Sequence, residues 1–450
     1  MRRDLLALIL VVLLHCLLFE SGLGGSDGWG YFANVESLVE DRDLDLANNL
    51  SPKGKEGAEG AVGTSEGRLG GMPHPTKPGR VVNSYPLVKA FLDMPFYLLG
   101  RAGGAVLGGV RLPSMAGTPY EGIPPRRLFC VLGLVFASNV WAAAAVAFSF
   151  LALLRIGFSR PAAFAASLLA FFASPMPFYA VNGMSHSAAT MVSAALLLAW
   201  VSGAGPLGLG ALVSLAVGLR YGSILLVPGI GLLLLAQGRE GILRRLCFYV
   251  LGLASLAWIE ALRNFLEYGS PTASVYGSVT ESLILWPVPV LNLFTAFRHG
   301  ILWWSPLVAF AMWGLCRKPA EAPKRSAVAM AWVLYLGHSL LASVGGSFHA
   351  GSGFSQRYLC ESMPAWALGV AFLLEGAGKG RLLGFSLLAG WNYLLFLLTA
   401  ARLCRYSAEA GGTRLGWVLS DYLYVFDERM GIGEVLKRIL HATVPGQFFR

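Results

Sequence analysis

Four polar stretches of this largely apolar chain hold the residue types that acid–base and phosphate chemistry requires. Their side chains are Asp27, His186, the neighbours Arg298 and His299, and Arg357. A carboxylate can serve as a general base, and Arg or His side chains can donate hydrogen bonds to a phosphate. The pattern therefore predicts a site in which one base faces several groups that can carry positive charge.

The stretch around Arg357 is rich in glycine, which lets the backbone come close to a ligand. It reads GGSFHAGSGFSQRY, and its candidate substrate-binding residues are His349, Gln356, Arg357 and Tyr358. The planar guanidinium of an Arg suits a phosphate. The alternative is structural, with Arg357 binding lipid headgroups. His186, in NGMSH, is a candidate proton donor or phosphate ligand, or a structural residue at a helix end.

Asp27 begins a segment with helical spacing, because Tyr31, Val35 and Leu38 fall on one face. This spacing predicts a short amphipathic helix along a membrane surface. Asp27 is then the predicted N-cap, a role that is compatible with catalysis since a cap fixes the carboxylate. Glu36 and Glu40 are expected on the solvated side of this helix, and the acidic run 41–45 is expected to form a solvated turn.

The composition is that of a polytopic membrane protein. Of 450 residues, 55% are hydrophobic and 13% are charged, whereas soluble domains carry about 25% charged residues. The basic residues behind the net charge of +10 lie between apolar runs, so they predict membrane orientation and no nucleic-acid partner. The six Cys residues form no CxxC pair, and neither a zinc site nor a disulfide framework is indicated.

The expected fold is all-α, with about eleven transmembrane helices and a long first extracytoplasmic loop, 20–127, that carries interfacial helices. Within that loop, 85–107 is expected to be interfacial or re-entrant, with a true span as the alternative. Residues 1–401 then form the bundle and 402–450 an outer tail. The expected spans are 5–19, 128–154, 161–181, 187–201, 207–219, 224–236, 246–262, 300–316, 327–345, 364–375 and 382–401.

The charge pattern also predicts the orientation. With a cytoplasmic N-terminus, the predicted inner loops hold clusters such as Arg239/Arg244/Arg245, and most outer loops hold single basic residues. This asymmetry follows the positive-inside rule. It places all four candidate stretches on the outer face of a cell or inner membrane.

These stretches, in this order, resemble the GT-C superfamily of integral membrane glycosyltransferases, near the bacterial relatives of protein O-mannosyltransferases and of the lipid A aminoarabinose transferase. The stretches that carry the resemblance are SDGWGYFANVESLVEDRDLDLANN, YAVNGMSHSAATMVSAALLLAW, FRHGILWWSPL and GSFHAGSGFSQRYLCESMPAWALG. No one of them is specific, and their order along most of the chain carries the weight.

The resemblance implies a transferase that takes a hexose or pentose from a polyprenyl-phosphate donor, with inversion, to a lipid, glycan or protein acceptor. Asp27 matches the catalytic acid of the first outer loop, and Arg357 the basic residue near the lipid phosphate. The family often has two adjacent acids where this chain has Asp27 and Gly28, so a divalent metal and the role of Asp27 stay open. A phosphate leaving group needs mainly positive charge, unlike the leaving group of a glycosidase.

Two other functions stay open from the residues. A transporter or flippase would show half-chain repeats and charges at mid-membrane, whereas the polar groups here gather at one face. The other alternative is a different membrane transferase or polymerase acting on lipid-linked glycans.

Overall fold

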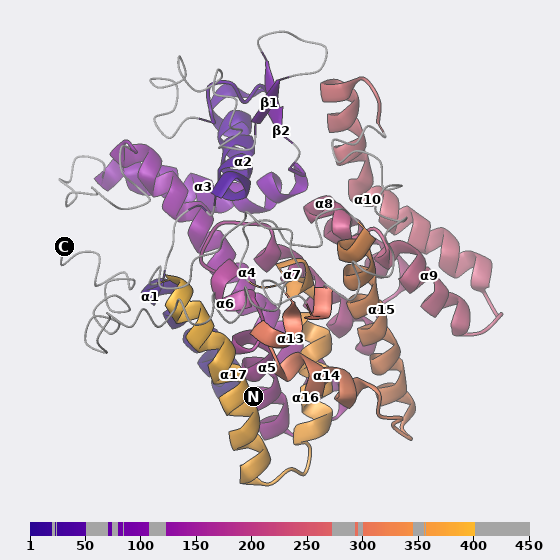
Figure 1. Ribbon diagram of the computed structural model, residues 1–450. Coiled ribbons are helices and arrows are strands. Elements are labelled where there is room, and N and C mark those ends of the chain that lie inside the picture. Colours follow the sequence, from indigo (N-terminus) through magenta and orange to yellow (C-terminus); the bar gives the residue numbers. More distant parts are fainter. Residues whose placement is uncertain are drawn as a thin grey trace, which may run out of the picture.

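The computed structural model describes residues 1–19, 23, 25–50, 71–73, 80–83, 85–107, 123–271, 293–295, 300–344, 355 and 357–400. Its elements form a helical bundle beneath a smaller group of elements, which we call the cap (Figure 1). The cap comprises α2 (Gly25–Glu36), the π-helical turn η1 (Ser37–Asp41), β1 (Gly71–Pro73), β2 (Val81–Asn83) and α3 (Val88–Leu107).

The bundle begins with α1 (Arg2–Leu18) and continues after the cap. Its first elements are α4 (Pro125–Ile156), α5 (Arg160–Phe172), α6 (Met176–Tyr179), α7 (His186–Val201), α8 (Pro206–Leu219), the 3-10 turn η3 (Tyr221–Ser223), α9 (Leu226–Ala236) and α10 (Ile242–Tyr268). The later elements are α13 (Ile301–Trp304), α14 (Leu307–Leu315), α15 (Ala322–Val344), the 3-10 turn η4 (Arg357–Ser362), α16 (Met363–Leu374) and α17 (Lys379–Ala400).

The central helix α4 begins and ends at residues that are common at helix termini. Pro125 opens α4, where its missing N–H costs nothing. The helix ends at Gly157, whose φ of +100° places it in the left-handed region that glycine adopts without strain. The N–H groups of Gly157 and Phe158 bond back to the carbonyls of Leu154 and Leu153, each at 3.1 Å. These bonds satisfy carbonyls that would otherwise lack partners.

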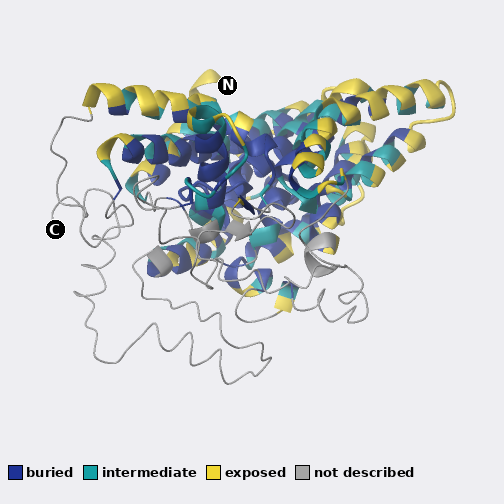
Figure 2. Ribbon diagram, turned by 90° about the horizontal axis from the view of Figure 1, so that it is seen from above, coloured by how far each residue is buried: buried dark blue, intermediate teal, exposed yellow. Residues whose placement is uncertain are grey.

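The long central helix α4 packs against α1, α3, α5 and α7. Buried residues concentrate in the middle of the molecule (Figure 2). Glycines allow backbones to touch: a Cβ at Gly133 of α4 would lie 2.3 Å from the Phe96 carbonyl oxygen of α3, and one at Gly252 of α10 would lie 2.2 Å from the Leu207 oxygen of α8. Close helix approach through small residues is common in membrane bundles, and here it fixes α3 and α10 onto the bundle.

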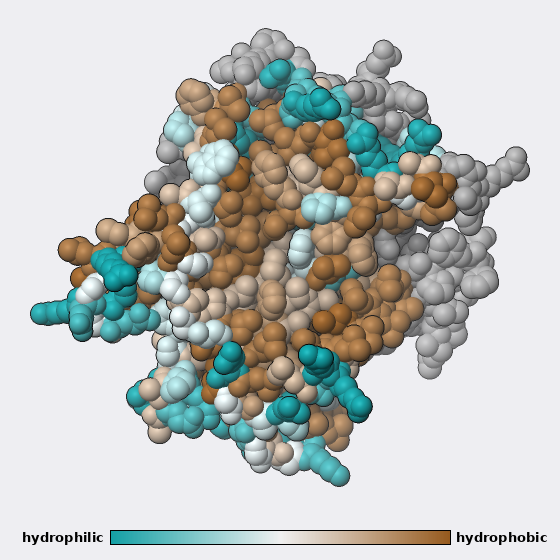
Figure 3. Space-filling model, turned by 180° about the vertical axis from the view of Figure 1, so that it is seen from behind, coloured by the Kyte–Doolittle hydropathy of each residue, from teal (hydrophilic) through white to brown (hydrophobic). Residues whose placement is uncertain are grey.

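The structure supports a polytopic membrane fold. Within the part of the chain that the structure describes, three helices are long and apolar enough to cross a bilayer: α4, α10 and Lys379–Leu398 of α17. Hydrophobic side chains cover most of the middle of one face, and hydrophilic side chains gather at its margins (Figure 3). The expected count of about eleven spans, and the division into bundle and tail, stay predictions.

Three details differ from the expected fold. The span expected at 161–181 is broken after Phe172, where Ser174 and Pro175 separate α5 from the short helix α6. The span expected at 300–316 is likewise broken at Ser305–Pro306, between α13 and α14. The cap contains a small antiparallel pair, β1 with β2, in which Met72 faces Val82.

The segment 85–107 contains the helix α3 (Val88–Leu107), which runs obliquely across the cap in Figure 1; whether it lies in the interface or spans the membrane stays a prediction.

Candidate functional site

Asp27 lies in the first turn of α2, inside the helix, so its predicted role as N-cap is wrong. The predicted helix itself is present, and its apolar face buries Phe32 and Val35 completely. The Asp27 carboxylate makes two contacts instead of capping: it accepts a hydrogen bond from Tyr85 Oη at 2.8 Å and one from Arg357 Nη1 at 3.0 Å. Helix α2 therefore holds the carboxylate between the cap and the bundle.

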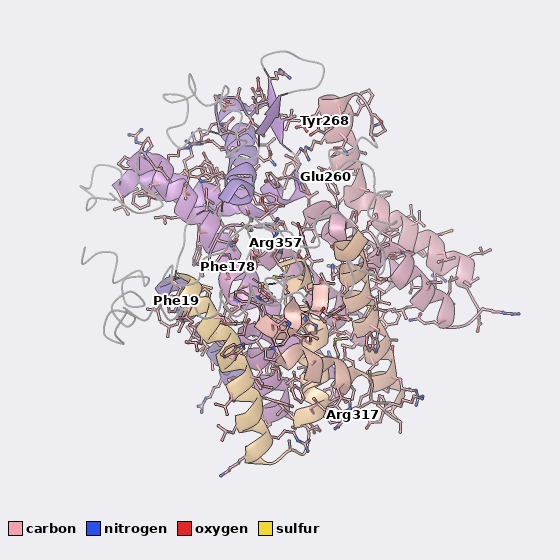
Figure 4. The ribbon with its side chains drawn as sticks, viewed as in Figure 1. Phe19, Phe178, Glu260, Tyr268, Arg317 and Arg357 are labelled. Carbon is pink, nitrogen blue, oxygen red and sulfur yellow. The ribbon has the colours of Figure 1, made fainter. Side chains whose placement is uncertain are left out.

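Arg357 comes from the other end of the sequence, at the start of η4. Its second guanidinium nitrogen, Nη2, lies 3.3 Å from Tyr358 Oη, and its side chain is only 18% exposed, against 25% for Asp27. Figure 4 shows Arg357 near the middle of the molecule, below the cap. Just before it, Ser355 adopts φ +49°, a strained conformation for a residue with a side chain. The structure thus brings together Asp27 and Arg357, as the sequence predicts.

A second buried group of charges lies beside this pair. Glu361 Oε1 is 3.1 Å from Arg220 Nη1 and 3.3 Å from His186 Nδ1. Arg220 also lies 2.9 Å from His186 Nε2, and the guanidinium groups of Arg220 and Arg357 both lie over the Tyr358 ring, at 5.4 and 5.2 Å from its centre. Both cations therefore contact the same aromatic ring.

Burial controls the electrostatics of this group. It raises the pKa of the Glu361 carboxyl, against the opposing effect of Arg220. Burial alone would lower the pKa of Arg357, but Tyr358 and Asp27 outweigh it and raise that pKa above its ordinary value. Arg357 is therefore a permanent cation, and its Nε has no hydrogen-bond partner within the described chain. A guanidinium with a free donor is suited to an additional anion.

The predicted site residues divide into two groups. Asp27, His186, Arg357 and Tyr358 are described and lie together. Arg298, His299, His349 and Gln356 fall outside the described residues.

Glu36 is a correction, because the sequence placed it on a solvated face. It is buried and forms a two-pronged pair with Arg127 at 2.9 and 2.7 Å, and burial raises its pKa against the effect of Arg127.

Three residues of the site were missed by the sequence analysis: Tyr85, Arg220 and Glu361. Arg220 and Glu361 each stand as a lone charge at the edge of an apolar run, and a buried lone charge requires a partner. That signal marks the two as a potential pair. Tyr85 gives no comparable signal, because its hydroxyl reaches Asp27 only through the folding of α3 against α2.

Close packing explains why position 28 holds a glycine, and it also limits which metal ligands this position could supply. A Cβ at this position would lie 3.0 Å from the carbonyl carbon of Leu23 and 3.2 Å from the carbonyl oxygen of Asn182. A second acid cannot occupy this position without moving α2. The described residues contain no group of three or more His, Cys, Asp or Glu side chains placed to hold a metal, and the Glu361–His186 pair of this site has Arg220 beside it. These residues do not fit a divalent cation.

Solved structures provide the comparison for this arrangement. ArnT from Cupriavidus metallidurans bound to undecaprenyl phosphate matches with a TM-score of 0.52 at 14% identity, over 99% of this chain and 74% of that one. Its apo state matches with a TM-score of 0.50 at 15% identity over the same shares. The chain has the GT-C fold. The oligosaccharyltransferase AglB from Archaeoglobus fulgidus, in complex with an inhibitory peptide and a dolichol-phosphate, is more distant, with a TM-score of 0.47 at 14% identity over 97% and 59% of the two chains.

No family model and no curated protein sequence matches the chain. The GT-C fold predicted from the four stretches is therefore confirmed by structural similarity, whereas the overall sequence identity to these structures is only 14–15%. A fold shared at this identity leaves the activity to be argued from the site.

Proposed function

We propose that this protein is a membrane glycosyltransferase that transfers a sugar from a polyprenyl-phosphate donor to an acceptor, with Asp27 as the catalytic base. The observation that carries the proposal is the Asp27–Arg357 contact of 3.0 Å, with Arg220 beside it. One base and two cations meet at the edge of an apolar bundle, and the ArnT structure with the same fold was determined with undecaprenyl phosphate bound.

The reaction needs little more than these groups. The acceptor hydroxyl attacks the anomeric carbon, the bond from that carbon to the phosphate oxygen breaks, and the phosphate leaves with the electron pair. Asp27 takes the proton of the hydroxyl as general base. Arg357 and Arg220 stabilise the negative charge that develops on the phosphate. Attack on the face opposite the leaving group inverts the anomeric centre.

Arg357 has two anionic partners in this scheme, and they are used in turn. Without donor, it neutralises Asp27. Because its Nε lacks a partner in the described chain, a phosphate adds a strong charge-assisted acceptor. As the guanidinium turns toward the phosphate, Asp27 keeps the Tyr85 hydrogen bond and becomes free to accept a proton. Donor binding therefore activates the base.

The proposed topology follows the charge pattern of the loops. The N-terminus lies in the cytoplasm and the site faces the outer side, where the lipid-linked sugar is presented. The acceptor is a lipid, a glycan or a protein.

The test is direct. The purified protein is reconstituted with a panel of polyprenyl-phosphate hexoses and pentoses, and release of the free lipid phosphate is measured with membrane extract as acceptor source. Release with one donor, stoichiometric with sugar appearing on an acceptor, is the expected result. Movement of intact donor across the bilayer without release would refute the proposal and favour a flippase.

A further inference from the structure

A buried carboxylate of α10 contacts elements on two sides of the site without touching the site itself. Glu260 Oε1 accepts the backbone N–H groups of Leu87 and Val88, at 2.5 and 3.0 Å. Its other oxygen, Oε2, accepts the hydroxyl of Tyr221 at 2.9 Å. The side chain is 11% exposed, and Figure 4 shows it where α10 passes the cap.

The contact of Glu260 with Leu87 and Val88 is connected to Asp27 through Tyr85. Leu87 and Val88 begin α3, where N–H groups have no partner within the helix. Two residues earlier stands Tyr85, whose hydroxyl bonds Asp27. The Tyr85 ring lies against Gly30, where a Cβ would come within 2.2 Å of the ring. Fixing the start of α3 thus fixes the hydroxyl that orients the base.

The second contact leads to the cations. Tyr221 directly follows Arg220, which pairs with Glu361 at 3.1 Å. The turn η3 that carries Tyr221 connects α8 to α9, and the hydrogen bond from Tyr221 to Glu260 ties this turn to α10. Glu260 therefore sets the spacing between the Asp27 side and the Arg220 side.

The rest of α10 argues against a role limited to filling space. Its large apolar side chains are exposed, for example Leu251 at 59% and Trp258 at 58%. Its buried polar residues, Glu260, Arg263 and Glu267, recur at helical spacing on the inner face. Arg263 is nearer to Glu267, at 2.9 Å, than to Glu260, at 3.5 Å. A counter-ion for Arg263 therefore exists without Glu260.

We infer that Glu260 is a positioning residue for the reaction proposed above: it holds Tyr85, and through it Asp27, at a fixed distance from Arg220. The length of its side chain and its ability to accept hydrogen bonds matter for this positioning, and its negative charge matters less. The inference rests on the proposed function for its kinetic test but not for its structural one.

Two variants distinguish the effect of the length of the Glu260 side chain from the effect of its charge. Glu260→Asp keeps the charge and shortens the side chain, so the contacts to α3 and η3 are lost. Glu260→Gln keeps the length, an acceptor for the N–H groups and a polar partner for Tyr221, and removes the charge. We expect Glu260→Asp to lower kcat about tenfold to a hundredfold, because a misplacement near 1 Å costs that much. Glu260→Gln should retain most of the activity. The reverse order would overturn the inference.

The matched control is Glu267→Asp, which shortens a carboxylate on the same buried face that pairs with Arg263 of its own helix. It should leave kcat within about twofold of the wild type, since the hydrogen bond of Glu267 goes to Arg263 of its own helix. Equal losses in Glu267→Asp and Glu260→Asp would assign the effect to helix packing and would reject a positioning role.

A double-mutant cycle tests the route through Tyr85. If Glu260 acts through this residue, Glu260→Asp costs much less in a Tyr85→Phe background than alone. Fully additive losses would contradict that route. A structure of Glu260→Asp gives an independent readout: Tyr85 Oη should move beyond hydrogen-bond distance of Asp27. If the wild type transfers no sugar, the proposed function fails, and this structural result still decides the positioning role.

Discussion

Replacing Asp27 by Asn tests the proposed base with very little change of shape. The amide oxygen can still accept the hydrogen bond from Tyr85, whose hydroxyl lies 2.8 Å from the present carboxylate. The change removes the negative charge opposite Arg357 and the ability to take up a proton. The two losses have different sizes, and this difference makes the experiment informative.

The loss of stability should be small. The side chains of Asp27 and Arg357 are 25% and 18% exposed, and ion pairs that reach solvent contribute about 0–1 kcal/mol. The loss of catalysis should be large, because a positioned general base contributes roughly a hundredfold to ten-thousandfold. That range corresponds to about 3–5 kcal/mol in the barrier. The barrier change therefore exceeds the stability change several times over.

The assay measures release of lipid phosphate by reconstituted protein, together with thermal unfolding in detergent. The matched control is Glu40→Gln. It removes the charge from the Glu40–Arg101 pair of the same cap, which is 3.2 Å long and also partly exposed, and keeps an oxygen that can accept the Tyr97 hydrogen bond. We expect equal small shifts in unfolding temperature for both variants and loss of transfer only for Asp27→Asn. Transfer by Asp27→Asn at more than a tenth of the wild-type rate would refute the role of Asp27 as base.

Three further changes have distinct expected outcomes. Arg357→Ala should raise the apparent KM for the donor about tenfold to a hundredfold, the value of a charge-assisted hydrogen bond; an unchanged KM would mean that Arg357 is structural. Gly28→Ala should destabilise the fold by about 1–3 kcal/mol through overpacking, measured by thermal unfolding. Gly384→Ala is the control and should not destabilise it, because nothing lies within 4 Å of the added atom. Equal stability of both variants would contradict the close packing of α2. Burial raises the pKa of the Glu361 carboxyl above its ordinary value of 4.5. Its contribution to the stability of the fold is therefore complete below pH 4.5 and is lost as the pH rises through the raised pKa, so the unfolding temperature should fall over this pH range. Glu361→Gln should flatten that fall, and a variant whose unfolding temperature changes with pH as the wild type's does would contradict the prediction.

Sequence reasoning performed best where periodicity and polarity decide the outcome. The apolar runs predict a helical membrane bundle, the spacing after Asp27 predicts the amphipathic helix, and the four stretches in order carry the resemblance to the GT-C fold. The meeting of Asp27 with Arg357 was predictable because the loop charges predict that both segments lie on one side of the membrane. That argument needs no knowledge of which helices touch.

It failed where the choice of partner depends on tertiary packing. Glu36 belongs to an acidic run that a solvated helix face explains equally well, and only the fold places Arg127 within 2.7 Å of it. Asp27 looks like a cap because Asp is common at that position, whereas in the fold its carboxylate bonds Tyr85, which precedes α3, and Arg357 of η4. The breaks at Pro175 and Pro306 were visible as residues, but a proline kinks some helices and ends others.

The charges of α10 show how a buried cation is neutralised in this protein. Charged side chains in an apolar helix are costly unless they are paired. Arg263 has Glu260 three residues before it and Glu267 four residues after it, on one face. The acidic partners of this cation therefore lie on its own helix, and its neutralisation does not depend on any other element.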